Sequence, residues 1–362
     1  MKNLLPHLAP ILFKKRLTEL TFFTTNKCNM HCKHCFVTEE LNTQSDNFLS
    51  VDEIVKMGEY IPNMQRVHLG GGEPFSRSDI SELAVALSNS WKTGVICIPT
   101  NGWFGDNIMK TIEDFGQHGY GNLRLHFSIN SPIPEDMDSF TQVQGSFAKW
   151  RKNITQALNA SRQYDNITIV ALSSFNEYNQ DVFIELIDFL IDEVEVDDFS
   201  FHLVRSHGDY HPILKIDKFN DAIDYFFNHK SKDNALLRAF RTKIREKTAD
   251  YYQQPEYTTA CAAATSRIVM SPTGDIYPCE KIGYPNLIEK DKWFMGSIRD
   301  YDYNIKQLLA DKSAVDVRDK ILTGRCHCDH GIDSSLSQLS TMKFKVDVIS
   351  HAFVNYVFKE KI

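Results

Sequence analysis

Three cysteines stand close together near the N-terminus, in the segment CNMHCKHCF that runs from 28 to 36. Cys28, Cys32 and Cys35 follow the spacing C-x3-C-x2-C. Clustered thiolates bind zinc or iron–sulfur clusters. A structural zinc site takes four closed ligands, and no fourth cysteine lies nearby. Iron–sulfur cubanes also usually take four thiolates, so a cubane held by this triplet would leave one iron open to a small molecule.

A second group of cysteines lies late in the chain, at Cys261, Cys279, Cys326 and Cys328. In a cytosolic chain such clustering favours metal binding over disulfides. These four predict one further cluster or a four-thiolate zinc site, in which His327 or His330 is a possible substitute ligand. The remaining cysteine, Cys97, stands in the apolar run GVICIPT and is expected to be a packed core thiol.

The elements that must position these cysteines alternate between strand and helix. Apolar and β-branched runs predict strands, which cover 20–25, 66–71, 94–100, 123–130, 167–174 and 198–205. Amphipathic segments predict helices between them, which cover 51–60, 78–91, 107–118, 145–164 and 179–194, the first with Ser50 as its cap. This rhythm predicts an α/β fold with a parallel sheet, a partial (β/α)6 barrel. The first cysteines follow the first strand directly, so we expect them at the carboxyl ends of the strands, the working face of such a barrel.

The triplet followed by Phe36, after the first strand of a β/α barrel, resembles the signature of the radical S-adenosylmethionine (SAM) superfamily. The resemblance implies a [4Fe-4S] cluster whose open iron is chelated by SAM. Reductive cleavage of SAM would then give methionine and a 5′-deoxyadenosyl radical that abstracts hydrogen from a substrate. The cofactor supplies that chemistry, and the protein orients it and excludes water.

The ends of the next strands extend this resemblance. In HLGGGEPF, Gly71, Gly72 and Glu73 match the family segment along the methionine end of SAM, where glycines permit close backbone approach and a carboxylate receives the ammonium. The remaining SAM candidates are Thr100, Asn101, Ser128 and Asn130 for the carboxylate and ribose, and Phe36 for the adenine. Asn130 and Ser131 depart from the family pattern, which has Asp and Gly there.

The rhythm changes after about residue 212. Residues 216–250 look helical and charged, and 261–282 predict a β-hairpin with a Ser-Pro-Thr-Gly turn that contains Gly274. The spacing C-x12-G-x4-C and the later CHC resemble the SPASM and twitch domains attached to many radical SAM enzymes, although a C-x2-C pair is usual there. Four cysteines match the shorter twitch form, which implies an auxiliary [4Fe-4S] cluster.

These observations predict five segments in the chain. They are a lead-in (1–19), the radical SAM partial barrel (20–212), a helical connector (213–255), a twitch-like α+β auxiliary-cluster domain built on the hairpin (256–335) and a C-terminal helix (336–362).

The auxiliary cluster indicates the type of reaction. A closed cluster that accepts an electron from a substrate radical favours net oxidation, either dehydrogenation or bond formation, and such a step needs a base. Arg205, His202 and His207 lie at the end of the sixth strand, where any of them could meet the substrate. We select Arg205 as the candidate catalytic-site residue, although an arginine more often anchors an anionic group.

Composition limits the partners and the location. The net charge of −7 argues against nucleic acid, and no apolar run reaches the roughly 20 residues of a membrane span. The N-terminus has two prolines and ends in KKR, so it is expected to be a lead-in of a cytoplasmic enzyme and not a signal peptide. The expected partners are a substrate and an electron donor such as flavodoxin or ferredoxin.

The substrate class stays open at this point. Only 27 residues precede Cys28, too few for a leader-binding domain, which favours a small molecule. The alternatives are a peptide-modifying radical SAM enzyme and a non-catalytic iron–sulfur or zinc metalloprotein.

Overall fold

The structure is a computed structural model that describes residues 17–37, 41–43, 47–61, 63–207, 210–284, 290–330 and 336–359. Residues 1–16 of the predicted lead-in lie outside the described residues. No described helix is long and apolar enough to span a bilayer.

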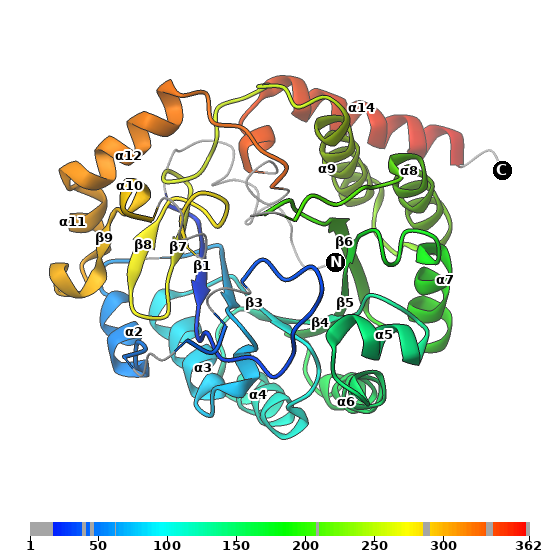
Figure 1. The fold of residues 1–362 in the computed structure, drawn as a ribbon, viewed down its shortest axis with the longest axis horizontal. Helices are drawn as coiled ribbons and strands as arrows, with labels where there is room; N and C mark the ends of the chain where they lie inside the picture. The colour runs from blue at the N-terminus through cyan, green and yellow to red at the C-terminus, as the bar shows by residue number, and fades with distance from the viewer. Residues whose placement is uncertain are drawn as a thin grey trace.

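A nine-stranded sheet forms the centre of the molecule, in the order β6-β5-β4-β3-β2-β1-β7-β8-β9 (Figure 1). The strands are β1 (Glu19–Phe23), β2 (Arg66–Gly70), β3 (Val95–Thr100), β4 (Asn122–Ser128), β5 (Ile167–Phe175), β6 (Asp198–Leu203), β7 (Arg267–Met270), β8 (Asp275–Tyr277) and β9 (Gly296–Ser297). Strands β1 to β6 and β7 are parallel, and β8 and β9 are antiparallel additions. The predicted α/β fold with an open, largely parallel sheet is confirmed.

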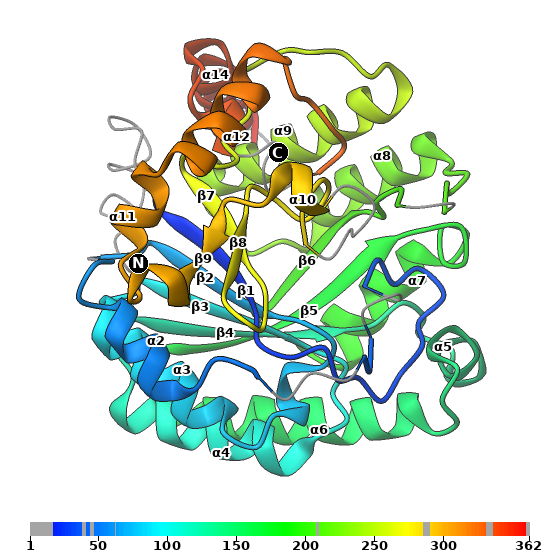
Figure 2. The same ribbon diagram turned by 60° about the vertical axis from the view of Figure 1, so that its left-hand side comes forward.

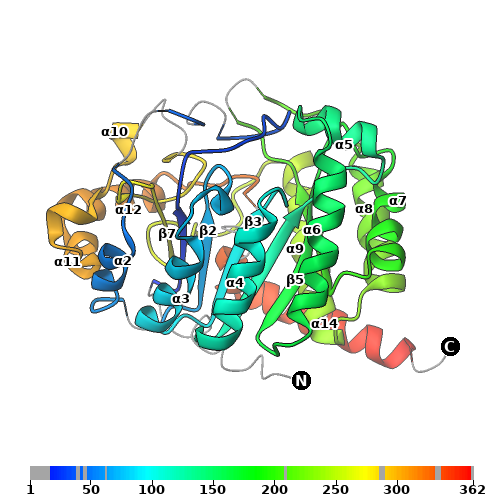
Figure 3. The same cartoon turned by 90° about the horizontal axis from the view of Figure 1, so that it is seen from below.

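Helices cover the outside of this sheet. Up to β6 they are α2 (Val51–Met57), the short 3-10 helix η1 (Pro74–Ser76), α3 (Ile80–Trp91), α4 (Gly105–His118), α5 (Pro134–Thr141), α6 (Ser146–Ser161), and α7 (Phe183–Asp188) continued by the π-helix η2 (Phe189–Glu193). Figure 3 shows α3, α4 and α6 side by side across one face. Every predicted strand and helix of residues 20–205 is therefore present, with ends shifted by a few residues.

The two faces of the sheet differ in chemistry. Side chains that point outward, such as Phe22, Ile96 and Phe127, are apolar and inaccessible to solvent because the helices cover them. The other face carries polar and ionisable side chains in register. Thr21 lies opposite His68, which lies opposite Cys97 on β3. A concave polar face of this kind suits a substrate chamber.

The segment after β6 returns as helices and then joins the sheet. It contains α8 (Ile216–Tyr225), η3 (Phe226–Lys230), α9 (Ala235–Gln253), α10 (Lys290–Trp293), η4 (Ile298–Tyr301), α11 (Ile305–Ala310), α12 (Lys312–Thr323) and α14 (Met342–Lys359). Figure 2 shows α9, α12 and α14 on the side of the sheet opposite α3, α4 and α6. The helical character of 216–250 and of the C-terminal segment is confirmed.

The predicted hairpin is present, but it is not separate from the barrel. Strands β7 and β8 pair across a tight turn in which Gly274 has a positive φ of 95°, a conformation that favours glycine. Strand β7 also pairs in parallel with β1, so that residues Arg267–Met270 extend the central sheet. The predicted barrel and the predicted auxiliary domain therefore share one continuous sheet. The boundary between them stays a prediction.

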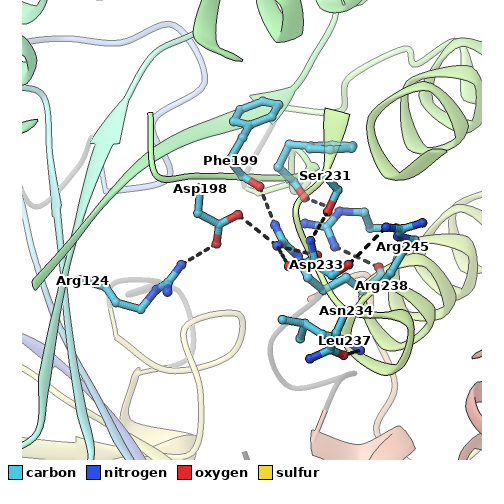
Figure 4. A network of polar contacts seen from close by, with 11 residues as sticks. Arg124, Asp198, Phe199, Ser231, Asp233, Asn234, Leu237, Arg238 and Arg245 are labelled. Atoms are coloured by element: carbon cyan, nitrogen blue, oxygen red, sulfur yellow. Dashed lines mark hydrogen bonds and ion pairs between the residues drawn. The ribbon is translucent and has the colours of Figure 1, made fainter. Parts of the chain in front are cut away.

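Two arginines of α9 cover the free edge at β6 (Figure 4). Arg241 donates to the carbonyl of Phe199 and to Asp198, which in turn accepts from Arg124 of β4. Arg245 donates to the carbonyl of Phe201 at 3.0 Å. An edge strand exposes unpaired carbonyls that invite further pairing, and these guanidinium groups occupy them.

The predicted cap of α2 is confirmed and has a wider role. Ser50 and Glu53 form a reciprocal capping box, which satisfies two backbone N–H groups at the start of the helix. The Glu53 carboxylate also accepts from Arg299 Nε at 2.7 Å and from the Tyr303 hydroxyl at 2.7 Å. This contact joins an early helix to the segment that follows β9.

Candidate functional site

The loop after β1 presents three thiols at the carboxyl ends of the strands. Cys28, Cys32 and Cys35 are all partly accessible to solvent. Burial raises the pKa of the Cys28 thiol to about 11 and that of Cys32 to about 12, and the neighbouring thiols add to the effect. The three thiols lie on one short loop, where burial means that thiolates require a compensating cation.

The loop is held in place by hydrogen bonds at both ends. The Asn42 side chain donates to the Cys28 carbonyl and accepts from the Cys28 N–H, each at 3.1 Å. The N–H groups of His31 and Lys33 donate to the last carbonyls of α5. The Cys28 Sγ also accepts from the Met30 N–H at 3.4 Å. The loop therefore keeps its shape through backbone contacts, the Asn42 side chain and a bond to one of its sulfur atoms.

The three thiols of the loop are of the type that ligates iron–sulfur clusters. Within the described ranges, no three His, Cys, Asp or Glu side chains are arranged to hold one metal ion. A cubane is bound differently, because each thiolate ligates its own iron. Three neighbouring thiols on one accessible loop match that requirement and leave one iron open.

Glu73 is the buried link between the ends of β2 and β3. Its side chain is 1% exposed and accepts hydrogen bonds from Phe75 N at 3.0 Å, Thr100 Oγ1 at 2.9 Å and Asn101 N at 2.6 Å. Burial raises the pKa of this carboxyl to about 7, although these donors favour the ionised form. Glu73, Thr100 and Asn101 are thus brought together as the sequence suggested, and the carboxylate binds protein donors.

The glycines before Glu73 pack against the cysteine loop. A Cβ on Gly71 would lie 2.2 Å from the Thr25 carbonyl oxygen, and one on Gly72 would lie 2.3 Å from that of Lys27. Gly71 also has a positive φ of 134°. The sequence assigned these glycines to close approach by a ligand, and the structure adds close approach by the cysteine loop as a second requirement.

The remaining strand ends complete a ring of amides and hydroxyls. Asn101 Nδ2 donates to Asn29 Oδ1 of the cysteine loop at 2.9 Å. Asn130 is 6% exposed, and its Oδ1 accepts from Asn176 Nδ2 at 3.2 Å. Ser128 is the last residue of β4. Sequence reasoning missed Asn176, although its position directly after the fifth strand is the signal that would have found it.

The concave face carries three histidines, of which the sequence reasoning named His202 and missed His68 and His126. Burial lowers the pKa of His126 and of His202 to about 3 and that of His68 well below its ordinary value, so all three are neutral. His202 lies 3.2 Å from the Ser174 hydroxyl. His68 and His126 Nε2 have no hydrogen-bond partner within the described part of the chain. Polar residues at alternate positions in strands that are otherwise apolar were the available signal.

Phe36 and Arg205 meet above this face. The Arg205 guanidinium carbon lies 4.6 Å from the centroid of the Phe36 ring, and Arg205 Nη1 donates to Glu280 Oε2 at 3.2 Å. The loop after β6 also touches the cysteine loop through His207 Nε2, which lies 3.3 Å from the His34 carbonyl oxygen. Arg205 thus lies beside the candidate adenine-contacting ring, and its contact with a carboxylate suits an anchoring role better than that of a base.

The late cysteines gather from segments that are distant in sequence. Cys261, Cys326 and Cys328 line one cavity of about 390 Å³ beside the end of α9. Cys279 is 5% exposed and does not line that cavity. His327 is at the cavity wall, whereas His330 is buried against Glu280. Three thiols that line one cavity could hold an auxiliary cluster, with the buried Cys279 as a candidate fourth ligand.

Comparison with known proteins decides the family. Residues 22–190 match the model described as the radical SAM superfamily. This segment is a radical SAM domain. The match covers β1 through the helix before β6, and it contains the cysteine loop and the ends of β2 to β5.

Curated relatives include GTP 3′,8-cyclases. The protein of Syntrophomonas wolfei is 23% identical over 176 residues, which are 48% of this chain and 52% of that protein. The protein of Campylobacter curvus is 26% identical over 304 residues, which are 81% of this chain and 89% of that protein. The chain spans about half the length of most of the curated relatives it matches.

Solved structures of radical SAM proteins share the fold. SuiB of Streptococcus suis bound to S-adenosylmethionine superposes with a TM-score of 0.60 at 16% identity, over 86% of this chain and 68% of that one. The protein anSMEcpe with bound AdoMet superposes with a TM-score of 0.58 at 15% identity, over 94% of this chain and 97% of that one. Both superpositions extend beyond residue 190, so the resemblance in fold includes part of the C-terminal region.

Proposed function

We propose that this protein is a radical SAM enzyme whose Cys28, Cys32 and Cys35 hold a [4Fe-4S] cluster. When bound, the cluster and SAM supply a 5′-deoxyadenosyl radical that abstracts hydrogen from the substrate. The observation that carries the proposal is the convergence of the β2 and β3 ends on the cysteine loop, through Glu73 and Asn101 in particular.

The residues around the loop have distinct roles in this proposal. Gly71 and Gly72 bring the backbone after β2 against the cysteine loop, and in this proposal the same backbone lies along the methionine end of SAM. Glu73 fixes the ends of β2 and β3 relative to each other. The amides, hydroxyls and ring that bind SAM are those of Thr100, Asn101, Ser128, Asn130 and Phe36. Arg205 faces the substrate.

We further propose that Cys261, Cys279, Cys326 and Cys328 hold an auxiliary [4Fe-4S] cluster, and that the reaction is a net oxidation of a small molecule. The shared cavity wall of three of these cysteines supports the first part. The polar concave face with neutral imidazoles supports a small polar substrate. An electron donor such as flavodoxin or ferredoxin would reduce the first cluster.

Two other substrate classes have specific support. The Campylobacter curvus relative, named a GTP 3′,8-cyclase, aligns over 81% of this chain, which supports a nucleotide. The SuiB structure bound to precursor peptide SuiA superposes with a TM-score of 0.61, which supports a peptide. A non-catalytic metalloprotein would bind iron or zinc without cleaving SAM.

The decisive experiment measures iron, sulfide and zinc per chain after anaerobic reconstitution, together with 5′-deoxyadenosine formed from SAM and dithionite. The wild type is compared with a variant in which Cys28, Cys32 and Cys35 are alanine. About eight irons falling to about four, with loss of 5′-deoxyadenosine, supports two cubanes. About four irons falling to none, with zinc present, rejects the auxiliary cluster. Iron without SAM cleavage by the wild type rejects the enzyme.

A further inference from the structure

The cysteine loop contains an amide donor that the protein itself does not satisfy. Asn29 directly follows Cys28. Its Nδ2 is inaccessible to solvent and has no hydrogen-bond partner within the described part of the chain. A buried donor without an acceptor is destabilising, and such groups are uncommon in folded proteins. The Asn29 amide therefore calls for an acceptor that the chain does not supply.

Hydrogen bonds fix the orientation of this amide. The Trp103 N–H donates to Asn101 Oδ1 at 3.0 Å, so the Asn101 side chain has only its Nδ2 left for the cysteine loop. That Nδ2 donates to Asn29 Oδ1 at 2.9 Å. Exchange of the Asn29 nitrogen and oxygen would place two donors against each other. Nδ2 is therefore the Asn29 atom that lacks an acceptor.

The surroundings of Asn29 indicate which acceptor would suit it. On one side is Cys28, whose Sγ already accepts from the Met30 N–H at 3.4 Å. On the other side is Asn101, whose N–H donates to the Glu73 carboxylate at 2.6 Å. The proposed function brings two anionic acceptors to this loop, the sulfur atoms of the cluster and the carboxylate of SAM. Hydrogen bonds to ionised acceptors are about twice as strong as those between neutral groups.

We infer that Asn29 Nδ2 donates a hydrogen bond to an anionic acceptor of the bound cofactors, either a sulfur atom of the cluster or the SAM carboxylate. This inference rests on the proposed function, since it concerns the cofactors of the same loop. Asn101 is then also a positioning residue, because it orients the Asn29 amide. A bond to cluster sulfur raises the reduction potential of the cluster, whereas a bond to the carboxylate raises the affinity for SAM.

Two substitutions separate the donor from the contact that supports it. Asn29→Asp keeps an oxygen that accepts from Asn101 and removes the Nδ2 donor, whereas Asn29→Ala removes both. His31→Asp is the matched control, because it places the same added charge at an exposed position of the same loop. Each protein is reconstituted anaerobically. The reduction potential of the loop cluster is measured without SAM by a titration followed by electron paramagnetic resonance, and SAM affinity is measured by calorimetry.

N29D is compared with H31D, and N29A with the wild type. If the acceptor is cluster sulfur, both N29 variants should reduce the equilibrium constant for one-electron reduction about tenfold, which lowers the potential by about 59 mV. If the acceptor is the SAM carboxylate, both should bind SAM at least tenfold more weakly at an unchanged potential. Either result supports the inference. An unchanged potential together with unchanged SAM affinity overturns it.

A variant that fails to hold the cluster is also informative. If N29D loses the loop iron, urea unfolding of the iron-free protein decides. An unchanged unfolding midpoint supports a donor to the cofactor, whereas a lowered midpoint overturns the inference, because the amide is then structural. A wild type that binds no iron or no SAM refutes the proposed function and this inference with it. A wild type that binds both, with N29 variants that behave like their controls, refutes only this inference.

Discussion

The two groups of cysteines are built in opposite ways. Cys28, Cys32 and Cys35 lie on one loop whose ends are held by Asn42 and by α5. Cys261, Cys279 and the Cys326–Cys328 pair come from three segments that only tertiary structure brings together. The first group depends on local sequence, and the second depends on the docking of the whole C-terminal half.

This difference has a functional consequence. The loop of the first group lies against the glycines and Glu73 at the strand ends, so its geometry is fixed by the barrel. The second group lies beside α9. Its segments are linked to the end of β6 through Glu280, which accepts from Arg205, and through Lys281, whose Nζ donates to the Ser206 carbonyl at 2.8 Å. Substitution of the late cysteines should therefore leave SAM cleavage at the first group intact. Substitution of the first three cysteines should abolish SAM cleavage.

The largest expected effect is the loss of SAM cleavage when a cysteine of the first group is replaced, compared with replacement of an isolated cysteine. Cys32→Ala should reduce SAM cleavage by at least a thousandfold, because a cubane with two thiolate ligands is poorly held. Cys97→Ala is the matched control: that thiol is 2% exposed on β3 and should cost about 1–2 kcal/mol of stability. Cleavage of SAM and iron content measure the outcome. Equal behaviour of the two variants would contradict the proposed site.

A second experiment tests the independence of the late group. Replacing Cys326 and Cys328 by alanine should remove about four irons and abolish substrate oxidation. Formation of 5′-deoxyadenosine should stay within about threefold of the wild-type rate. Loss of SAM cleavage in this variant would show that the two groups act as one unit, and the proposed independence of the late group would be wrong.

A third experiment tests the contact between the glycines and the cysteine loop. Gly72→Ala places a methyl group 2.3 Å from the Lys27 carbonyl oxygen, so the loop must move. We expect SAM affinity to fall at least tenfold and stability to fall by about 1–3 kcal/mol. Gly70→Ala is the control, since nothing lies within 4 Å of the added methyl group. Calorimetric titration with SAM and urea unfolding give the two quantities.

The smallest effect concerns the junction of the two halves at Glu53. Burial alone would raise the pKa of this carboxyl, but hydrogen bonds from Arg299, the Ser50 N–H and Tyr303 lower it from 4.5 to about 2. Because the folded-state pKa is depressed, the stabilisation is present above about pH 4.5 and is lost as the pH falls toward 2. Solvent screening limits it to about 1 kcal/mol.

Urea unfolding at pH 7 and at pH 3 measures that contribution. Glu53→Gln should be less stable than the wild type by about 1 kcal/mol at pH 7, and the difference should shrink at pH 3. Glu59→Gln, at an exposed position nearby, should match the wild type at both values. A difference independent of pH would mean that Glu53 acts through packing and not through its charge.

Much of the fold could be predicted because the signals are local. The alternation of apolar strands with amphipathic helices from 20 to 205 predicted the parallel sheet, and Ser50 predicted the start of α2. The hairpin turn was also visible, since Gly274 occupies a position with positive φ. The pairing of β7 with β1 was not, because no local pattern states which strand a distant segment will join.

In the candidate site, too, residues with a local sequence signal were predicted and residues placed by strand register were not. Its cysteines, its glycines and Glu73 were recognisable from spacing and from resemblance. His68, His126 and Asn176 were missed because each is an unremarkable polar residue until the register of the strands places it on the concave face.

The sequence by itself determined the chemistry of the first cysteine loop, since three thiols within eight residues remain neighbours in almost any fold. It also determined the strands whose carboxyl ends surround that loop. Only the tertiary structure decided that Glu280 would meet both Arg205 and Arg267, across 75 and 13 residues of chain. The physical reason is range: spacing along the chain fixes which groups are adjacent locally, whereas burial and charge balance between distant segments arise only when the sheet and its covering helices have assembled.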